Sequence, residues 1–224
     1  MTTPAVRRLQ WWGAFALCLA PLAKLGVDLA TGGLGANPIE AILNRLGFWT
    51  LTLLVASLAA TPVNALLGVS WPLRARRMIG LWAFAYATLH LLFYVAVDQG
   101  LDVGLLAADV AKRKFMTVGF AAWLLLVPLA VTSTDGWVRR LGFRAWKRLH
   151  RLVYAAAALG VVHFVWRVKA DLRLPLAFGA VLAVLLAARL VPEGFGLRRR
   201  RPPASRPAGP ARTASPAGPP PAGP

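Results

Sequence analysis

The stretch WKRLHRLVYAAAALGVVHFVW, residues 146–166, begins with basic residues, continues as an apolar run and holds two histidines 13 residues apart. A bilayer core about 30 Å thick needs roughly 20 mostly apolar residues per helix, so this stretch predicts a membrane-spanning helix. Its histidines are His150, at the basic start, and His163, inside the apolar run. Ionisable side chains are costly inside a membrane, so they are functional candidates there.

The composition of the 224 residues places the chain among membrane proteins. Hydrophobic residues make up 58% of it, nine residues are tryptophan and the mean hydropathy is +0.58, which is typical of transmembrane chains. On a soluble protein the formal net charge of +18 would suit nucleic acid. Here the basic residues fall between apolar runs, so we expect a lipid environment and no nucleic-acid partner.

Six segments are long and apolar enough to cross the membrane. They are residues 11–30, 47–69, 78–97, 116–132, 150–168 and 174–191. The predicted fold is therefore an all-α integral membrane protein, a six-helix transmembrane bundle within residues 1–191. Residues 192–224 are rich in Pro, Ala, Gly and Arg and cannot bury a core, so we expect a disordered C-terminal tail there.

Basic residues between the six segments predict the orientation of the bundle. Of the 26 Lys and Arg residues, 17 fall at the N-terminus, in the second and fourth connections or in the tail, against seven in the other connections. Cytoplasmic segments of membrane proteins carry the excess of Lys and Arg. We therefore expect both termini to be cytoplasmic.

The single cysteine, Cys18, narrows the redox chemistry. It excludes an internal disulfide, a cysteine-ligated iron–sulfur cluster and covalent haem attachment through C-x-x-C-H. Neutral imidazole is the usual ligand of a buried haem iron, and all three histidines, His90, His150 and His163, lie in apolar segments. The first hypothesis is therefore a non-covalent haem that transfers electrons. No G-x-G-x-x-G fingerprint predicts a nicotinamide site.

Depth counting separates the three histidines. At 1.5 Å per residue, His90 lies roughly 20 Å outward from Arg77, and His163 lies four residues before Arg167, which should mark the outer boundary. His90 and His163 thus share the outer half of the membrane on different helices, as a bis-histidine haem requires, whereas His150 lies near the inner face. On an ideal helix His150 and His163 are also about 140° apart, so tilt, a local irregularity or different partners are needed. Interhelical hydrogen bonding is the competing interpretation.

Four stretches resemble the ferric-reductase-like transmembrane superfamily, and within it the MsrQ (YedZ) family of haem-binding membrane subunits of bacterial methionine-sulfoxide reductase systems. The last stretch carries two histidines and is the most specific. The stretches are GANPIEAILNRLGFW at 35–49, RRMIGLWAFAYATLHLLFYVAVD at 76–98, KFMTVGFAAWLLLVPLAVTST at 114–134 and LGFRAWKRLHRLVYAAAALGVVHFVWRVK at 141–169.

The resemblance implies a b-type haem protein of the bacterial inner membrane. Electrons would pass to a periplasmic molybdopterin-dependent methionine-sulfoxide reductase (MsrP-like), which carries the catalysis and repairs oxidised envelope proteins. FMN is implied as a further cofactor, with a cytosolic flavin reductase or the quinone pool as electron donor. We expect an electron-transfer subunit with no catalytic residue of its own.

The sequence departs from the superfamily at one position. Two-haem members, such as the NADPH oxidases, carry histidine pairs on the third and fifth helices, but the residue 13 positions before His90 is Arg77. Two alternatives follow: one haem between His90 and His163, or a second, inner haem on His150 with an atypical partner or none. Arg77 could pair with a haem propionate or act only as a positive-inside anchor.

Two other functional classes stay open as alternatives. A transmembrane ferric or oxygen reductase would draw on a nicotinamide and flavin domain supplied by another subunit. A proton-coupled transporter could use the histidines as relay groups, although the sequence shows no internal repeat. Among the connections, the inner segment 137–148 is a candidate for a flavin phosphate or an acidic donor, and the outer segment 35–46 for docking the periplasmic partner.

Overall fold

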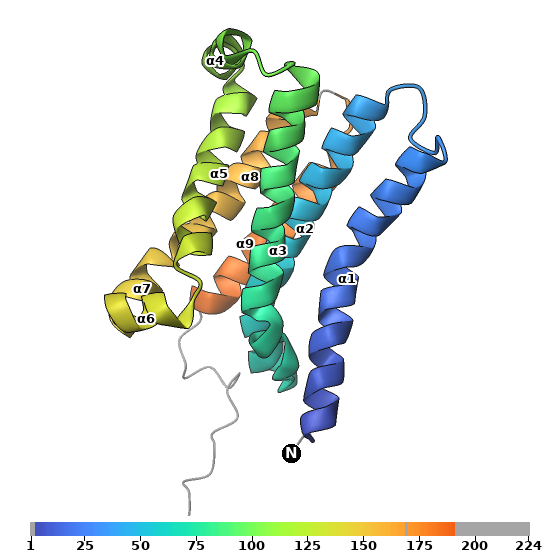
Figure 1. Ribbon diagram of the computed structural model, residues 1–224. Helices are drawn as coiled ribbons and strands as arrows, with labels where there is room; N and C mark the ends of the chain where they lie inside the picture. The colour runs from blue at the N-terminus through green and yellow to red at the C-terminus, as the bar shows by residue number, and fades with distance from the viewer. Residues whose placement is uncertain (1–2, 169, 191–224) are drawn as a thin grey trace, which may run out of the picture.

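The computed structural model describes residues 3–168 and 170–190, and this part of the chain is helical throughout, without a β-strand (Figure 1). The all-α prediction is therefore confirmed. The helices are α1 (Pro4–Ala30), α2 (Pro38–Leu67), α3 (Trp71–Phe93), the π-helix η1 (Tyr94–Asp98), α4 (Val103–Lys112), α5 (Lys114–Val131), α6 (Asp135–Leu141), α7 (Phe143–Leu149), α8 (Leu152–Arg167) and α9 (Arg173–Leu190).

Each of the six predicted segments coincides with a helix. Five stretches of the described chain are long and apolar enough to cross a membrane: α1, α2, α3 with η1, α5, and α7 with α8. The sixth predicted segment forms α9, which has 18 residues but is not one of these five. The count of six spans and the orientation of the termini stay predictions. The predicted tail, residues 192–224, lies outside the described residues.

Three short helices occupy connections in which the sequence predicted no helix. At one end of the bundle, the α4 end, Asp102 begins α4 because its Oδ1 accepts a hydrogen bond from the amide of Leu105, at 3.0 Å. At the opposite end, the α6 end, Thr134 begins α6 in the same way through the amide of Trp137. Gly142, with a φ of 74°, then turns the chain from α6 into α7. Figure 1 shows the two ends far apart.

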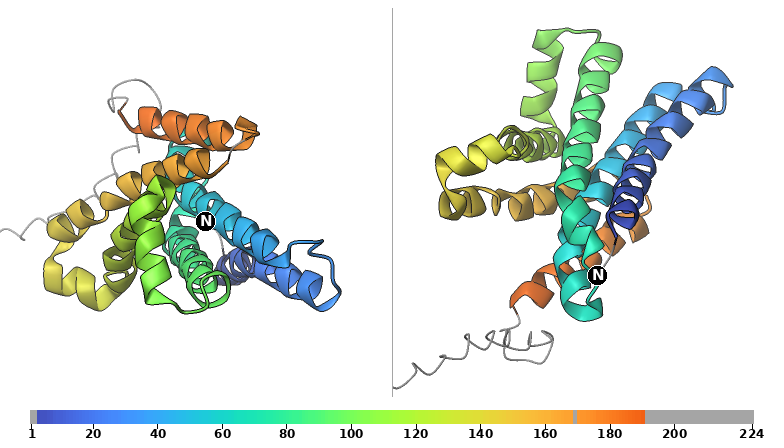
Figure 2. Two further views of the ribbon diagram at one scale, coloured as in Figure 1. Left: turned by 90° about the horizontal axis from the view of Figure 1, so that it is seen from above. Right: turned by 60° about the horizontal axis from the view of Figure 1, so that its bottom comes forward.

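Two helix pairs pack against each other most extensively, α2 with α3 and α5 with α8. Figure 2 shows α9 lying against α8, and α1 at the edge of the bundle beside α3. Small residues let the helices approach: Ala83 and Ala157 have no exposed surface and Ala156 is 1% exposed. Membrane helices pack through such residues because lipid provides no hydrophobic driving force between helices.

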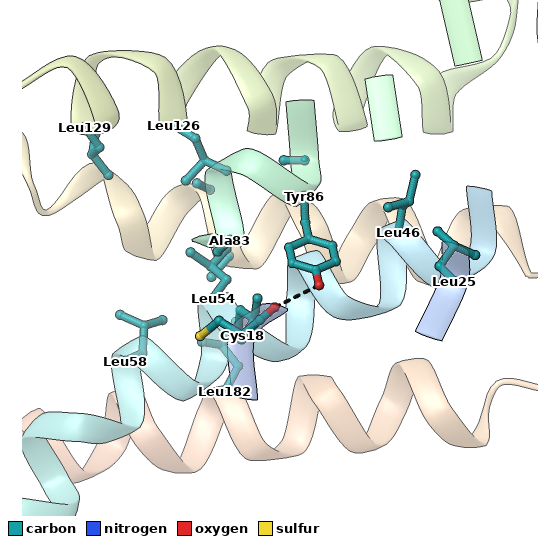
Figure 3. Close-up of a cluster of buried hydrophobic side chains, with 14 of the residues drawn as sticks. Cys18, Leu25, Leu46, Leu54, Leu58, Ala83, Tyr86, Leu126, Leu129 and Leu182 are labelled. Carbon is teal, nitrogen blue, oxygen red and sulfur yellow. Dashed lines mark hydrogen bonds between the residues drawn. The ribbon is translucent and has the colours of Figure 1, made fainter. Parts of the chain in front are cut away.

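Tyr86 ties α1 to this core. Its ring is 1% exposed, and its hydroxyl donates to the backbone oxygen of Cys18 on α1 at 2.8 Å (Figure 3). Leucines surround the pair, among them Leu46, Leu54 and Leu126 (Figure 3). A buried tyrosine hydroxyl needs such a partner, so the bond fixes how α1 sits on α3.

Candidate haem site

The structure brings His90 and His163 together near the α4 end. His90 lies one turn before the end of α3 and His163 one turn before the end of α8. Their ring centres are 6.3 Å apart and the ring planes are nearly perpendicular, at 87°. Two imidazoles from helices distant in sequence therefore share one site.

A backbone carbonyl orients each ring. Nδ1 of His90 lies 3.0 Å from the carbonyl oxygen of Leu43 on α2, and Nδ1 of His163 lies 2.7 Å from that of Phe115 on α5. A carbonyl only accepts hydrogen bonds, so each Nδ1 must carry the proton and donate it. Each neutral ring then keeps Nε2 as a free lone-pair donor, and neither Nε2 bonds to a residue that the structure describes. This is the arrangement in which proteins hold metal-ligating histidines.

Two glycines make room for the rings against the neighbouring helices. A Cβ on Gly119 of α5 would lie 2.5 Å from Nδ1 of His163, a distance that no real contact shows. A Cβ on Gly47 of α2 would lie 3.3 Å from Cε1 of His90. Each ring is thus set into a notch at a glycine, and the notch at Gly119 has no room for a Cβ unless the ring moves.

A cavity of about 1340 Å³ adjoins the rings and includes both of them in its lining. Side chains from α2, α3, η1, α4, α5 and α8 surround it, and most are apolar, such as Leu91, Phe120 and Trp123. Small-molecule sites usually measure about 300–1,000 Å³, so this space accommodates a large cofactor. Asn44 also lines it, with a buried Oδ1 that has no partner among the described residues.

The rings and the cavity fit a haem with two histidine ligands. Metal–imidazole bonds are about 2 Å long, so a single iron ion fits between rings whose centres are 6.3 Å apart. The free Nε2 atoms would supply the ligands, and the apolar walls suit a porphyrin. Among the described residues no group of three or more His, Cys, Asp or Glu side chains could hold a metal ion.

Charged side chains border the cavity at the α4 end. Arg167 of α8 lies 3.4 Å from a carboxylate oxygen of Glu40 on α2, and both residues line the cavity. Arg113, which also lines it, contacts Asp109 of α4 through Nε at 3.2 Å. Asp109 in turn accepts a hydrogen bond from the hydroxyl of Tyr94 on η1, at 2.7 Å. The last contact holds α4 against η1, one turn beyond His90.

His150 lies apart from the other two histidines. Its ring packs on Trp146, with centres 4.0 Å apart, and its Nε2 lies 3.2 Å from the Thr132 hydroxyl at the end of α5. The chain is not one continuous helix here, because α7 ends at Leu149 and α8 begins at Leu152. Both a local irregularity and different partners therefore separate His150 from His163.

Arg77 also lies away from the cavity. It donates from Nη1 to Asp135 of α6 at 2.7 Å, at the α6 end of the bundle. It is not among the residues that line the cavity around His90 and His163. The sequence suggested two roles for Arg77, and its observed partner is a carboxylate of the protein.

Several residues of the site had not been singled out from the sequence. Gly47 and Gly119 could have been identified from the sequence, because an isolated glycine inside a helical pattern often allows close packing. The Tyr94–Asp109 contact could not, since it depends on a short helix that hydropathy does not reveal. From the sequence, Arg167 served only to mark the outer membrane boundary and Arg113 was counted only among the basic residues of the connections, so their place in the cavity lining was not predicted.

Known proteins match this chain over most of its length. The family described as ferric reductase like transmembrane component matches residues 46–161. Among curated relatives, a protein of Rhodospirillum rubrum is 57% identical over 87% of this chain and 92% of its own, and one of Ralstonia nicotianae is 48% identical over 83% and 85%. A relative from Caulobacter vibrioides is 50% identical over 77% and 82%. All three are named protein-methionine-sulfoxide reductase heme-binding subunit MsrQ. The chain therefore belongs to the ferric-reductase-like transmembrane family and, within it, to the MsrQ family.

Proposed function

We propose that this chain is the haem-carrying membrane subunit of a methionine-sulfoxide reductase system. It moves electrons across the bacterial inner membrane from the α6 end, on the cytoplasmic side, to the α4 end, on the periplasmic side. The observation that carries the proposal is the His90–His163 pair, with each Nδ1 bonded to a backbone carbonyl. The names of the relatives support the same reading.

His90 and His163 would hold the iron of a b-type haem, which supplies a one-electron carrier when bound. The chain's own residues set the ligand orientation: Leu43 and Phe115 fix the protons on Nδ1, and Gly47 and Gly119 let the rings lie close to α2 and α5. Ligation by two histidines would leave no open position on the iron, which would favour electron transfer over oxygen chemistry. A haem that is not bound covalently agrees with a single, buried Cys18.

The α6 end is the proposed entry for electrons. Helices α6 and α7 present Arg139, Arg140 and Arg144 beside other basic residues, which suits an FMN phosphate or an acidic flavin reductase, while quinone is the alternative donor. His150 remains a proposed ligand of a second, inner haem, and Arg77 a proposed partner of its propionate. To bind the cofactor, His150 would have to give up its contact with the Thr132 hydroxyl, and Arg77 would have to give up its ion pair with Asp135.

The α4 end is the proposed exit. A periplasmic molybdopterin-dependent reductase (MsrP-like) would dock there, on the segment 35–46 and α4, and would carry out the methionine-sulfoxide reduction. The membrane subunit then needs no catalytic residue for that reaction. Its task is to exclude water and to bring electrons to the periplasmic surface.

Reduced-minus-oxidised absorption spectra of the purified full-length protein test the ligand assignment. We expect His90→Ala and His163→Ala each to remove the outer b-type signal, because an iron with one histidine lost cannot keep the same spectrum. A full signal in either variant would remove that histidine from the ligand set.

His150→Ala serves as the companion variant. Haem per polypeptide, measured after pyridine extraction, separates the two stoichiometries. An unchanged ratio would establish one haem between His90 and His163, whereas a ratio falling by half would establish the inner haem. Circular dichroism of each variant shows that the helices persist, so loss of haem is not loss of fold.

A further inference from the structure

A second hollow lies on the opposite part of the molecule, in the groove between α1 and α3 at the α6 end. It has a volume of about 460 Å³. Figures 1 and 2 show α1 standing at the edge of the bundle, and of the described helices it contacts chiefly α3 and α2. The lining residues used below are Trp11, Phe15, Arg74, Arg77, Leu81 and Trp82.

Most of the groove is apolar and elongated. Along α3 its lining residues run from Arg74 to Ala85 at helical spacing, which corresponds to about 16 Å along the helix axis. Trp11 and Phe15 of α1 form the facing wall, with stacked rings whose centres are 5.7 Å apart. The rings of Phe15 and Trp82 also pack together, with centres 5.4 Å apart. An acyl chain fits such a surface.

Two arginines stand together at the end of the groove where α3 begins. Arg74 bonds only to neutral groups in the described part of the chain, the Ser70 hydroxyl and the Gln10 amide oxygen, at 3.1 and 2.9 Å. Arg77 donates a hydrogen bond from one guanidinium nitrogen to Asp135, whose side chain is 80% exposed. A guanidinium has five N–H donors, so both arginines keep donors for another acceptor. The local charge is positive, because one carboxylate faces two guanidinium groups.

We propose that this groove is a binding site for an anionic phospholipid. The phosphate lies between Arg74 and Arg77, and an acyl chain follows Leu81 and Trp82 along α3 towards the middle of the membrane. Basic pockets between transmembrane helices bind anionic headgroups in this way. The charge selects an anionic lipid over a zwitterionic one, whose choline would bring a third positive charge. The proposal does not depend on the haem proposed between His90 and His163, because Arg74 and Arg77 do not line that cavity.

Native mass spectrometry of the full-length protein in detergent tests the site, with phosphatidylglycerol and phosphatidylcholine of identical acyl chains as probes. We expect phosphatidylglycerol to bind the wild type at least about tenfold more tightly. Arg74→Gln with Arg77→Gln should reduce its affinity to that of phosphatidylcholine. Leu81→Trp, which fills the groove but keeps both arginines, should also weaken binding.

Two control variants separate a built site from general basicity. Arg139→Gln with Arg140→Gln removes the same charge from exposed positions on α6 and should leave the affinity unchanged. Asp135→Asn releases Arg77 from its ion pair and should leave the affinity unchanged or raise it. Equal affinity for the two lipids, equal losses in the two double variants, or a loss in Asp135→Asn would each overturn the proposal. The haem absorbance of Leu81→Trp, which keeps both arginines, should match the wild type.

Discussion

The ring centres of His90 and His163 are 6.3 Å apart, although the two residues lie 73 positions apart in the chain. Their common feature is the backbone carbonyl that each Nδ1 contacts, Leu43 for His90 and Phe115 for His163. Neither carbonyl comes from the helix that carries its histidine. Four helices, α2, α3, α5 and α8, thus determine the geometry of two side chains, which explains how a site in a membrane bundle is fixed before the cofactor arrives.

Gly119→Ala should lower the haem content sharply. The added Cβ would stand 2.5 Å from Nδ1 of His163 and would displace the ring from the Phe115 carbonyl. Gly47→Ala should have a smaller effect, because its Cβ would lie 3.3 Å from the His90 ring. Loss of an outer-shell partner typically costs about 10–100-fold in metal affinity. The amount of haem per polypeptide, measured by absorbance after purification, shows which of the two variants loses more haem.

Gly80→Ala is the matched control, because a Cβ at this position of α3 meets nothing within 4 Å. It should keep the wild-type haem content and, as a helix-interior Gly→Ala change, should not lower stability. If Gly119→Ala held as much haem as Gly80→Ala, the notch would not position the ring.

Hydropathy alone was enough to predict every long helix. A run such as 116–132 has few charges and a length set by the bilayer, so its position follows from counting residues. The shared depth of His90 and His163 followed from the same count, since a rise of 1.5 Å per residue converts position into height. Their role as ligands stays a prediction, now with a geometry that supports it.

The remaining features depend on contacts that no count of residues shows. Helix α4 is too short to span a membrane, and its place depends on the Asp102 cap and the Tyr94–Asp109 bond. The partner of His150, Thr132, lies on another helix and became visible only in three dimensions. Such contacts depend on the direction in which a side chain points around the helix axis, and not on its depth. An interruption like that between α7 and α8 changes this direction for all residues that follow, so helical spacing no longer predicts it.

Ala157→Leu should destabilise the bundle by about 1–3 kcal/mol, because Ala157 has no exposed surface and a larger side chain would push α8 away from its neighbours. Ala158→Leu, one residue further on an exposed face of α8, should change stability by no more than about 0.5 kcal/mol. Thermal unfolding in detergent compares the two. Equal losses would mean that α8 is not closely packed at Ala157.

Arg167→Gln should lower the midpoint potential of the haem. The guanidinium borders the cavity, and a positive charge favours the reduced, less positive state of the iron. For two unit charges roughly 15 Å apart and an effective dielectric constant near 20, Coulomb's law gives about 1 kcal/mol. For one electron this corresponds to about 40 mV. Glu40→Gln, which removes the carboxylate that contacts Arg167, should raise the potential.

Arg173→Gln is the control for this measurement, since Arg173 begins α9 and does not line the cavity. Potentiometric titration of the three variants and the wild type should give opposite shifts for Arg167→Gln and Glu40→Gln and almost none for Arg173→Gln. Shifts of the same sign in Arg167→Gln and Glu40→Gln would indicate a structural disturbance instead of a charge effect.

Tyr94→Phe should loosen α4 without changing the rest of the bundle. Helix α4 has no buried residue, and the bond from Tyr94 to Asp109 is its side-chain hydrogen bond to η1. A hydrogen bond to a charged group contributes about 1.5–3 kcal/mol, so amide hydrogen exchange within α4 should become at least about tenfold faster. Because α4 covers part of the cavity, haem should also dissociate faster.

Tyr154→Phe makes the same chemical change on α8, where the hydroxyl contacts Arg189, and should leave exchange in α4 at the wild-type rate. Equal exchange in all three proteins would show that the Tyr94 hydroxyl does not hold α4 over the cavity.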